Sequence, residues 1–295
     1  MIYKNILETI GHTPLLQIEK NIFAKFEGTN PTGSIKDRVA IKMITAAEKS
    51  GELKPGKTII EATSGNTGIS LAMIGAVLNY QVEIVMSSAV SIERQKMIRA
   101  FGAKIILTDE NNGTDGAIRK VKELTTKFPE KYFCTDQFSN KQNYLAHYET
   151  TGPEIFEEMN VANLSIDFFT AALGTSGTLM GTAKFLKKQN PNIKIFAAEP
   201  TLGHYIQGLK NMSEAIIPAI YDENFLDGKI AIETEMAFAA ARELIHQKGI
   251  FVGMSSGAAF LAAKKLAKQN PEKNIVTIFP DRGEKYLSTK LLMEG

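Results

Sequence analysis

The sequence predicts an α/β protein with two three-layer α/β domains and mostly parallel sheets. Short apolar runs typical of strands alternate with longer stretches of helical periodicity, and this alternation occurs in two separate runs along the 295 residues. In each run, one strand-to-helix turn is rich in glycine and hydroxyl residues, at the edge where open α/β sheets bind ligands. We therefore expect a ligand-binding cleft between two domains.

The first run begins with a helix near Ser34 that ends at Gly51, because apolar residues recur on one helical stripe between them. Ser91 is predicted to cap a later helix that Gly102 ends. The remaining predicted elements of this run are a strand at 58–62, a buried helix at 68–78, a strand at 82–86, a helix at 91–101, a strand at 104–107, a charged helix at 114–127 and a strand at 132–135.

The second run repeats this alternation. Its predicted elements are strands at 168–173, 193–198 and 275–279 and helices at 179–188, 234–248 and 256–268. Such alternation favours parallel sheets covered by helices on both faces. We place the boundary near residues 139–147. Residues 39–141 are assigned to a smaller domain, and residues 1–38 and 142–295 to a larger one.

Composition excludes several classes of protein. Apolar residues make up 44% of the chain and charged residues 22%, which is typical of globular proteins and not of disordered chains. No apolar stretch is long enough for a membrane span, and no secretory signal is recognised at the start. The net charge of +2 gives no indication of a nucleic-acid partner. A single cysteine, Cys134, fits a reducing cytoplasm, and we expect no metal site.

One motif is misleading. Residues Gly51 to Thr58 fit the pattern G-x-x-x-x-G-K-[ST] of a phosphate-binding P-loop. A P-loop follows a strand and opens a helix, whereas here a helix is predicted before the motif and a strand after it. Pro55 also removes one amide that a phosphate cradle would use. We interpret the segment as a helix stop followed by a turn.

The two strand-to-helix turns are better candidates for ligand binding. Glu61 to Gly68 offers hydroxyls, an amide and backbone N–H groups at a positive helix end, which suits a carboxylate or another small anion. Gly174 to Thr178 combines two glycines with three hydroxyl residues, which suits a phosphate. Each segment alone is equally compatible with an ordinary capped turn. Together, they favour one bipartite ligand bound between the domains.

A third segment, Asn30 to Arg38, places Lys36 in the first turn of a helix. The positive helix end disfavours a charged ammonium and should lower the pKa of Lys36, as a Schiff-base lysine requires. Most lysines are solvated surface residues, and the spacing alone does not distinguish Lys36 from them. Ser255, in Gly253 to Gly257, is by itself equally compatible with a simple helix cap.

Taken together, these segments resemble the cysteine synthases, or O-acetylserine sulfhydrylases, over nearly the whole chain. This family belongs to the tryptophan synthase β group of pyridoxal-phosphate (PLP) enzymes, known as fold type II. The four segments occur in the family's order and spacing. Three further matches are Gly11 to Leu15, Thr150 to Ile155 and Tyr286 to Thr289.

The resemblance implies specific roles for individual residues. Lys36 corresponds to the lysine that holds PLP as a Schiff base, and Asn66 to the side chain beside the 3′ oxygen of PLP. Ser255 corresponds to the serine that faces the pyridine nitrogen. The residues that correspond to the phosphate cup are Gly174, Thr175, Ser176, Gly177 and Thr178. Those that correspond to the grip on the substrate carboxylate are Thr63, Ser64, Thr67 and Gln137.

The resemblance also implies the reaction: O-acetyl-L-serine and sulfide give L-cysteine and acetate through an aminoacrylate intermediate, in a cytoplasmic homodimer. A cysteine-degrading, sulfide-producing β-elimination lyase and a cystathionine β-synthase-like enzyme stay open as alternatives. A non-catalytic partner protein is disfavoured because Lys36, Asn66 and Ser255 are all present. Neither the preferred acyl donor nor association with serine acetyltransferase follows from the sequence.

Asp281, which precedes an Arg-Gly pair, makes the chain more similar to the B-type isoform than to the A-type. The B-type is associated with thiosulfate as well as sulfide. It usually carries two arginines where this chain aligns Lys210 and Asn211, and a cysteine where it has Pro280. We therefore expect sulfide to be a better acceptor than thiosulfate.

Overall fold

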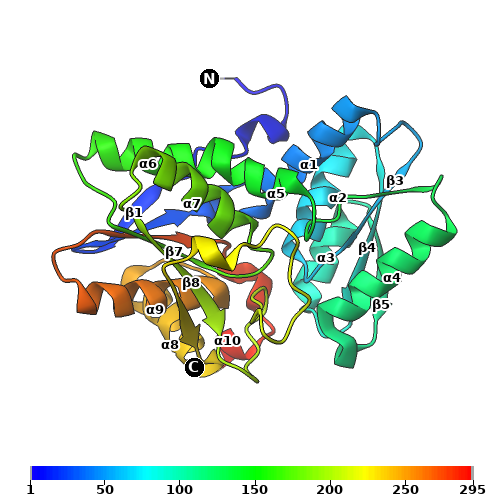
Figure 1. Cartoon of the computed structure of the whole chain (residues 1–295). Helices are drawn as coiled ribbons and strands as arrows, with labels where there is room; N and C mark the ends of the chain where they lie inside the picture. The colour runs from blue at the N-terminus through cyan, green and yellow to red at the C-terminus, as the bar shows by residue number, and fades with distance from the viewer. Residues whose placement is uncertain (1, 294–295) are drawn as a thin grey trace.

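The computed structural model describes residues 2–293 and contains two sheets, each covered by helices on both faces (Figure 1). One sheet has six strands in the order β1-β2-β10-β7-β8-β9, and the other has four in the order β5-β4-β3-β6. All neighbouring pairs are parallel except β1 with β2. The predicted α/β class with mostly parallel sheets is therefore confirmed.

The four-stranded sheet is buried on both faces because its strands are apolar at consecutive positions. In β3, Ile59 packs in the cluster with α1 and α2, whereas its neighbour Ile60 faces α4 on the opposite side. Its strands are β3 (Thr58–Ala62), β4 (Gln81–Ser87), β5 (Lys104–Thr108) and β6 (Tyr132–Cys134). Its helices are α1 (Lys36–Ser50), α2 (Asn66–Leu78), α3 (Ile92–Ala100) and α4 (Gly113–Lys127).

The six-stranded sheet is built from both ends of the chain. Its strands are β1 (Leu15–Glu19), β2 (Ile22–Phe26), β7 (Phe168–Ala172), β8 (Lys194–Pro200), β9 (Gly228–Ile232) and β10 (Ile275–Phe279). Its helices are α5 (Lys141–Ala146), the π-helical turn His147–Thr151, α6 (Gly152–Val161), α7 (Gly177–Gln189), α8 (Thr234–Lys248), α9 (Met254–Gln269) and α10 (Lys290–Met293). Short 3₁₀ turns lie at Ile6–Thr9, Glu27–Thr29, Glu110–Asn112, Glu223–Phe225 and Gly283–Tyr286.

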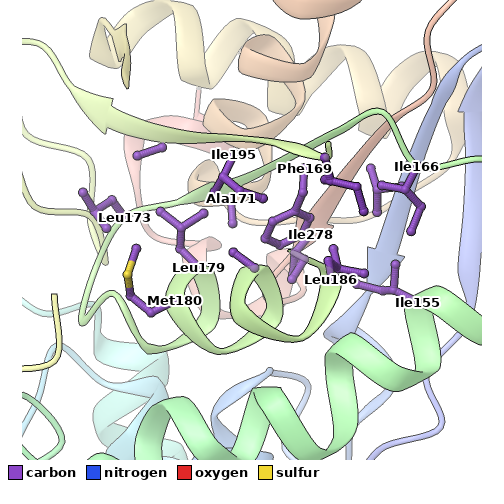
Figure 2. Close-up of a cluster of buried hydrophobic side chains, with 14 of the residues drawn as sticks. Ile155, Ile166, Phe169, Ala171, Leu173, Leu179, Met180, Leu186, Ile195 and Ile278 are labelled. Atoms are coloured by element: carbon purple, nitrogen blue, oxygen red, sulfur yellow. The ribbon is translucent and has the colours of Figure 1, made fainter. Parts of the chain in front are cut away.

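Helix α7 is fixed against this sheet by a buried apolar cluster (Figure 2). Leu179 and Leu186 of α7 pack in the same cluster as Phe169 of β7 and Ile278 of β10. All four side chains are fully buried. Because α7 begins at Gly177, this packing fixes the position of the turn between β7 and α7.

Several elements were not predicted from the sequence. They are β1, β2, β9, α5, α6 and α10. Strand β2 escapes prediction because Lys25 interrupts its apolar run, yet Lys25 is fully buried and lies 3.0 Å from Glu154 and 2.8 Å from Glu158. The prediction that Ser91 caps α3 is confirmed for the position but not for a capping side-chain hydrogen bond. Ser91 is the N-cap residue, but its hydroxyl donates to the carbonyl of Lys285 at 2.7 Å.

The misleading P-loop motif has the structure that its context predicts. Helix α1 ends at Ser50, Gly51 takes a left-handed φ of 78°, and β3 begins only at Thr58. Lys57 therefore precedes a strand rather than opening a helix. Among the described helices, none combines the length and hydropathy that a membrane crossing requires.

Candidate active site

The two sheets meet at a cleft whose space measures about 990 Å³, including its open mouth. Its walls come from the carboxyl ends of the strands in both sheets, where parallel α/β proteins bind ligands. Every predicted site residue except Gly177 lines it. These lining residues are Lys36, Thr63, Ser64, Asn66, Thr67, Gln137, Gly174, Thr175, Ser176, Thr178 and Ser255.

Lys36 is the first residue of α1 and its side chain enters the cleft. Burial lowers the pKa of its amine to about 8, while the nearby charge of Asp281 acts in the opposite direction. The lowered pKa was predicted, but burial rather than the helix end is its main cause. Asp37 fixes the preceding turn by accepting hydrogen bonds from the Thr32 backbone at 2.8 Å and the Ser70 hydroxyl at 2.6 Å.

The Thr63 to Gly68 loop is held by side-chain hydrogen bonds. The Thr67 hydroxyl donates to Gln137 Oε1 at 2.8 Å, and Gln137 Nε2 donates to the carbonyl of Ala62 at 2.9 Å. Gly65 has a φ of 133°, and a Cβ there would lie 2.2 Å from the side chain of Arg94. A glycine is therefore required both by the backbone conformation and by the close approach of Arg94.

Glu61 supports this loop from beneath. It accepts hydrogen bonds from the Thr135 hydroxyl and from the Gln137 backbone, the latter at 3.2 Å. Complete burial raises the pKa of Glu61 to about 7, although these hydrogen bonds favour its charged form. The loop therefore rests on a carboxyl group that titrates near neutral pH.

The Gly174 to Thr178 turn is shaped by close contacts. A Cβ on Gly174 would lie 2.5 Å from the carbonyl oxygen of Gly208, and one on Gly177 would lie 2.0 Å from Asn143 Oδ1. Ser176 adopts a left-handed φ of 68°, and its hydroxyl is buried without a hydrogen-bond partner among the described residues. An unsatisfied buried donor at the start of a helix is a ready position for an anion.

A buried histidine supports the same turn. His147 Nε2 lies 3.2 Å from the Thr178 hydroxyl, and its Nδ1 lies 3.0 Å from the Thr151 hydroxyl. Burial, together with the charges of Lys36 and Arg38, holds the pKa of His147 well below its ordinary value. The imidazole is therefore neutral at physiological pH.

Ser255 lies in the first turn of α9, after the N-cap residue Gly253, and is almost fully buried. The segment Gly253 to Gly257 also fits the G-x-S-x-G pattern of hydrolase nucleophile elbows. In the part of the chain that the structure describes, however, no histidine hydrogen-bonds to Ser255, so that pattern lacks the base it needs.

Several cleft residues were not predicted. Arg94, on α3, has only 2% of its surface exposed, donates to Gln207 Oε1 at 2.5 Å and stacks on the ring of Tyr286 at 4.3 Å. Lys210 was aligned but not assigned a contact. It lies 3.2 Å from Asp115 on α4 and 4.7 Å from the ring of Phe138. Both cations connect the two halves of the cleft.

The cleft combines a buried amine, an anion-ready turn and a polar loop, an arrangement that suits an enzyme with a phosphorylated cofactor. The sequence model of the pyridoxal-phosphate dependent enzyme family matches residues 6–281. Because the match spans most of the chain, the protein belongs to this family of enzymes and uses PLP.

Comparison with known proteins refines this assignment. The chain is 49% identical to cysteine synthase of Aquifex aeolicus, covering 99% of this chain and 93% of that one. It is 40% identical to cysteine synthase B of Escherichia coli, covering 97% and 95%. Its structure resembles that of cysteine synthase from Entamoeba histolytica, with a TM-score of 0.90, 44% identity and coverage of 99% and 91%.

A hydrogen sulfide-producing enzyme from Fusobacterium nucleatum is structurally similar too, with a TM-score of 0.91, 44% identity and coverage of 97% and 100%. The relatives named cysteine synthase match over almost their full length and include the B-type. Within the PLP enzymes, the chain therefore belongs to the cysteine synthase family.

Proposed function

We propose that this enzyme converts O-acetyl-L-serine and sulfide into L-cysteine and acetate. One observation carries the proposal: the Lys36 amine lies in the same cleft as the Gly174 to Thr178 turn and the Thr63 to Gly68 loop. An amine between a phosphate site and a carboxylate site is what PLP chemistry on an amino acid requires. The match to relatives named cysteine synthase supports this choice among PLP reactions.

The residues of the cleft fit PLP. The unpartnered Ser176 hydroxyl and the start of α7 offer donors for its phosphate. Asn66, whose Oδ1 is buried without a partner, and Ser255 would lie along its ring. A serine is a weak partner for a pyridine nitrogen, which favours elimination over reactions that need a strong electron sink. When bound, PLP supplies that sink and a carbonyl for the Lys36 amine.

The Thr63 to Gly68 loop would hold the substrate carboxylate, using Thr63, Ser64 and Thr67 together with Gln137. Its hydroxyls and helix-end N–H groups match the charge and size of a carboxylate. This grip would place the α-carbon of the substrate next to Lys36.

Lys36 would act as base and then as acid. Its pKa of about 8 leaves a useful fraction of neutral amine at neutral pH, as removal of a proton from the α-carbon requires. Acetate then leaves the β-carbon, the sulfur of the hydrosulfide ion (HS⁻) bonds to that carbon, and Lys36 returns the proton to the α-carbon. Atoms balance because acetate leaves where the sulfur nucleophile enters.

The cysteine-degrading lyase shares the first half of this reaction and differs in the acceptor, so products rather than residues separate the two. The most direct test is a product assay with purified enzyme and O-acetyl-L-serine, in which the acceptor is sulfide, thiosulfate, homocysteine or water. We expect cysteine with sulfide as the dominant outcome. Sulfide release from cysteine at a higher catalytic efficiency would overturn the biosynthetic assignment.

Lys36 itself is tested by borohydride trapping. We expect a PLP adduct on Lys36 of the wild-type chain and neither adduct nor turnover in Lys36→Ala. Lys42, on the same helix and paired with Glu149, provides a matched control, since Lys42→Ala should retain both. An adduct on any other lysine would refute the assignment.

We also propose that the enzyme acts as a cytoplasmic homodimer, on the basis of the family resemblance and the single cysteine. The domain limits at 39–141, and at 1–38 with 142–295, likewise stay a proposal. Sedimentation of the purified protein and limited proteolysis would test them.

A further inference from the structure

A buried carboxylate that the proposed chemistry does not use lies behind the cleft wall. Asp281 follows β10 and has no exposed surface. Its Oδ2 accepts hydrogen bonds from Asn66 Nδ2 at 2.7 Å and from the Tyr286 hydroxyl at 2.8 Å, and Arg94 Nη2 lies 3.7 Å away. Asp281 does not line the cleft itself, so it can reach a bound group by contact only through a neighbour, although its charge also acts on the Lys36 amine.

The backbone of this segment is fixed from two sides. The backbone of Ser34, two residues before Lys36, forms an isolated antiparallel β-bridge with that of Asp281. The Ile35 backbone N–H donates to the carbonyl of Pro280 at 2.8 Å. On the other side, the Gly253 backbone donates to the Asp281 carbonyl at 3.4 Å. The carboxylate is therefore held between the segments that lead to Lys36 and to Ser255.

Gly253 leaves room for this carboxylate. A Cβ there would lie 2.4 Å from Asp281 Oδ1 and 2.3 Å from the ring of Tyr286. The backbone of Gly253 has a φ of −82°, which any residue adopts, so the glycine is needed for space rather than for conformation. The packing around Asp281 thus favours its present position.

The chemistry of the two side chains decides how Asn66 is oriented. A carboxylate only accepts hydrogen bonds, so the end of the Asn66 amide that faces Asp281 must be its nitrogen. That nitrogen carries two hydrogens, and one is bound to Asp281. Turning the amide around would set its oxygen against the carboxylate, which is strongly unfavourable in a buried site. The second N–H is the one donor that the amide has left.

We propose that Asp281 is a positioning residue that holds the Asn66 amide so that its second N–H donates to the ionised 3′ oxygen of PLP. This inference rests on the proposed function, in which Asn66 lies beside that oxygen. Hydrogen bonds to PLP are a means by which a protein tunes the electronics of the cofactor. In this arrangement, Arg94 and Tyr286 would act by holding the Asp281 carboxylate in place.

The test compares PLP affinity and the absorption band of the bound cofactor in wild type, Asp281→Ala, Asp281→Asn and Glu284→Gln. D281A should raise the PLP dissociation constant by about tenfold and shift the band, because Asn66 loses its fixed partner. D281N should lose clearly less affinity than D281A, since its amide oxygen accepts the same hydrogen bond and both variants lose the charge that acts on Lys36. E284Q removes a charge 3.5 Å from Lys285 without contacting Asn66, and should match wild type.

Asn66→Ala separates positioning from a general structural effect. In the Asn66→Ala background, D281A and D281N should agree in PLP affinity within about twofold and show the same band, because both lose the charge near Lys36 and neither has an amide left to position. A band unmoved by D281A, or additive losses, would overturn the inference. If D281A does not fold, as judged by melting without PLP, Asp281→Ser takes its place.

Failure of the proposed function looks different. Borohydride trapping of wild type on a lysine other than Lys36 would refute the site itself. Trapping on Lys36, combined with a D281A variant that behaves like E284Q, would refute only the role of Asp281.

Discussion

The two ligand turns of the cleft have equivalent positions in the fold, but they differ in whether all their hydroxyl groups have hydrogen-bond partners. Both connect a parallel strand to a helix. In the Thr63 to Gly68 loop, the hydroxyls of Thr63 and Thr67 already have protein partners. In the Gly174 to Thr178 turn, Thr175 and Thr178 also have partners, but the buried Ser176 hydroxyl has none among the described residues.

This difference separates a site for a resident group from a site for a passing one. A turn with an unsatisfied buried donor is incomplete until an anion arrives, which suits a cofactor that stays bound. A loop whose side chains already pair with one another can exchange those bonds for bonds to a substrate and then restore them.

Gly177→Val should strongly weaken PLP uptake, with affinity falling by about a hundredfold. Its Cβ would lie 2.0 Å from Asn143 Oδ1, so the turn would have to move. Titration with PLP, followed by absorbance, measures this. Gly56→Ala, in a turn with open space around it, is the control and should bind PLP normally. Full uptake by the Gly177 variant would show that the phosphate binds elsewhere.

The carboxyl beneath the loop should make stability depend on pH. The pKa of Glu61 is raised from 4.5 to about 7 in the folded state, so the folded protein binds more protons than the unfolded chain between these values. The contribution of Glu61 to the free energy of unfolding should therefore fall as pH rises from about 5 to 8, by up to about 3 kcal/mol. The lowered pKa of His147 acts in the opposite direction, so the Glu61 part is obtained from the difference between wild type and Glu61→Gln. Urea unfolding at both pH values measures the fall.

Glu61→Gln should remove most of this decrease, because its amide does not titrate. The matched comparison is between the two pH values within each protein, which cancels the cost of the substitution itself. An equal decrease in wild type and variant would assign the pH dependence to another group.

Gln137→Ala should raise the KM for O-acetyl-L-serine by about tenfold and leave PLP affinity unchanged, because it removes a partner of the loop and not of the cup. Steady-state kinetics and a PLP titration measure the two quantities. Gln142→Ala, five residues away on α5, is the control. Weakened PLP binding in Gln137→Ala would mean that the two turns are not independent.

Lys210 connects the two halves of the cleft, and its effect should be the smallest. Its backbone donates to Leu173, next to the cup, at 2.7 Å, while its ammonium is paired with Asp115. One paired lysine is a poor clamp for a dianion, so sulfide should be at least about tenfold more efficient than thiosulfate. Asp115→Asn should narrow that ratio by about threefold. Comparable catalytic efficiencies with sulfide and thiosulfate in wild type would show that another cation binds thiosulfate.

Local patterns in the sequence predicted much of this arrangement. Apolar runs located most strands, and glycine with hydroxyl residues marked both turns. What failed depends on distant partners. Strand β2 was missed because it contains the charged Lys25, whose acidic partners belong to the distant helix α6. Similarly, the Asn66 to Asp281 contact joins residues 215 positions apart. The low pKa of Lys36 was expected from the helix end, whereas its main cause, burial, is not visible in a sequence.

The strand order also has a consequence for synthesis of the chain. Strand β10 lies between β2 and β7, so the six-stranded sheet has a gap at its centre until residues 275–279 leave the ribosome. The four-stranded sheet needs nothing beyond residue 134 for its hydrogen bonds. One half can therefore fold during translation, whereas the other has to wait for the last strand. Lys36 and Ser255 come together only then, so a chain released early carries no working site.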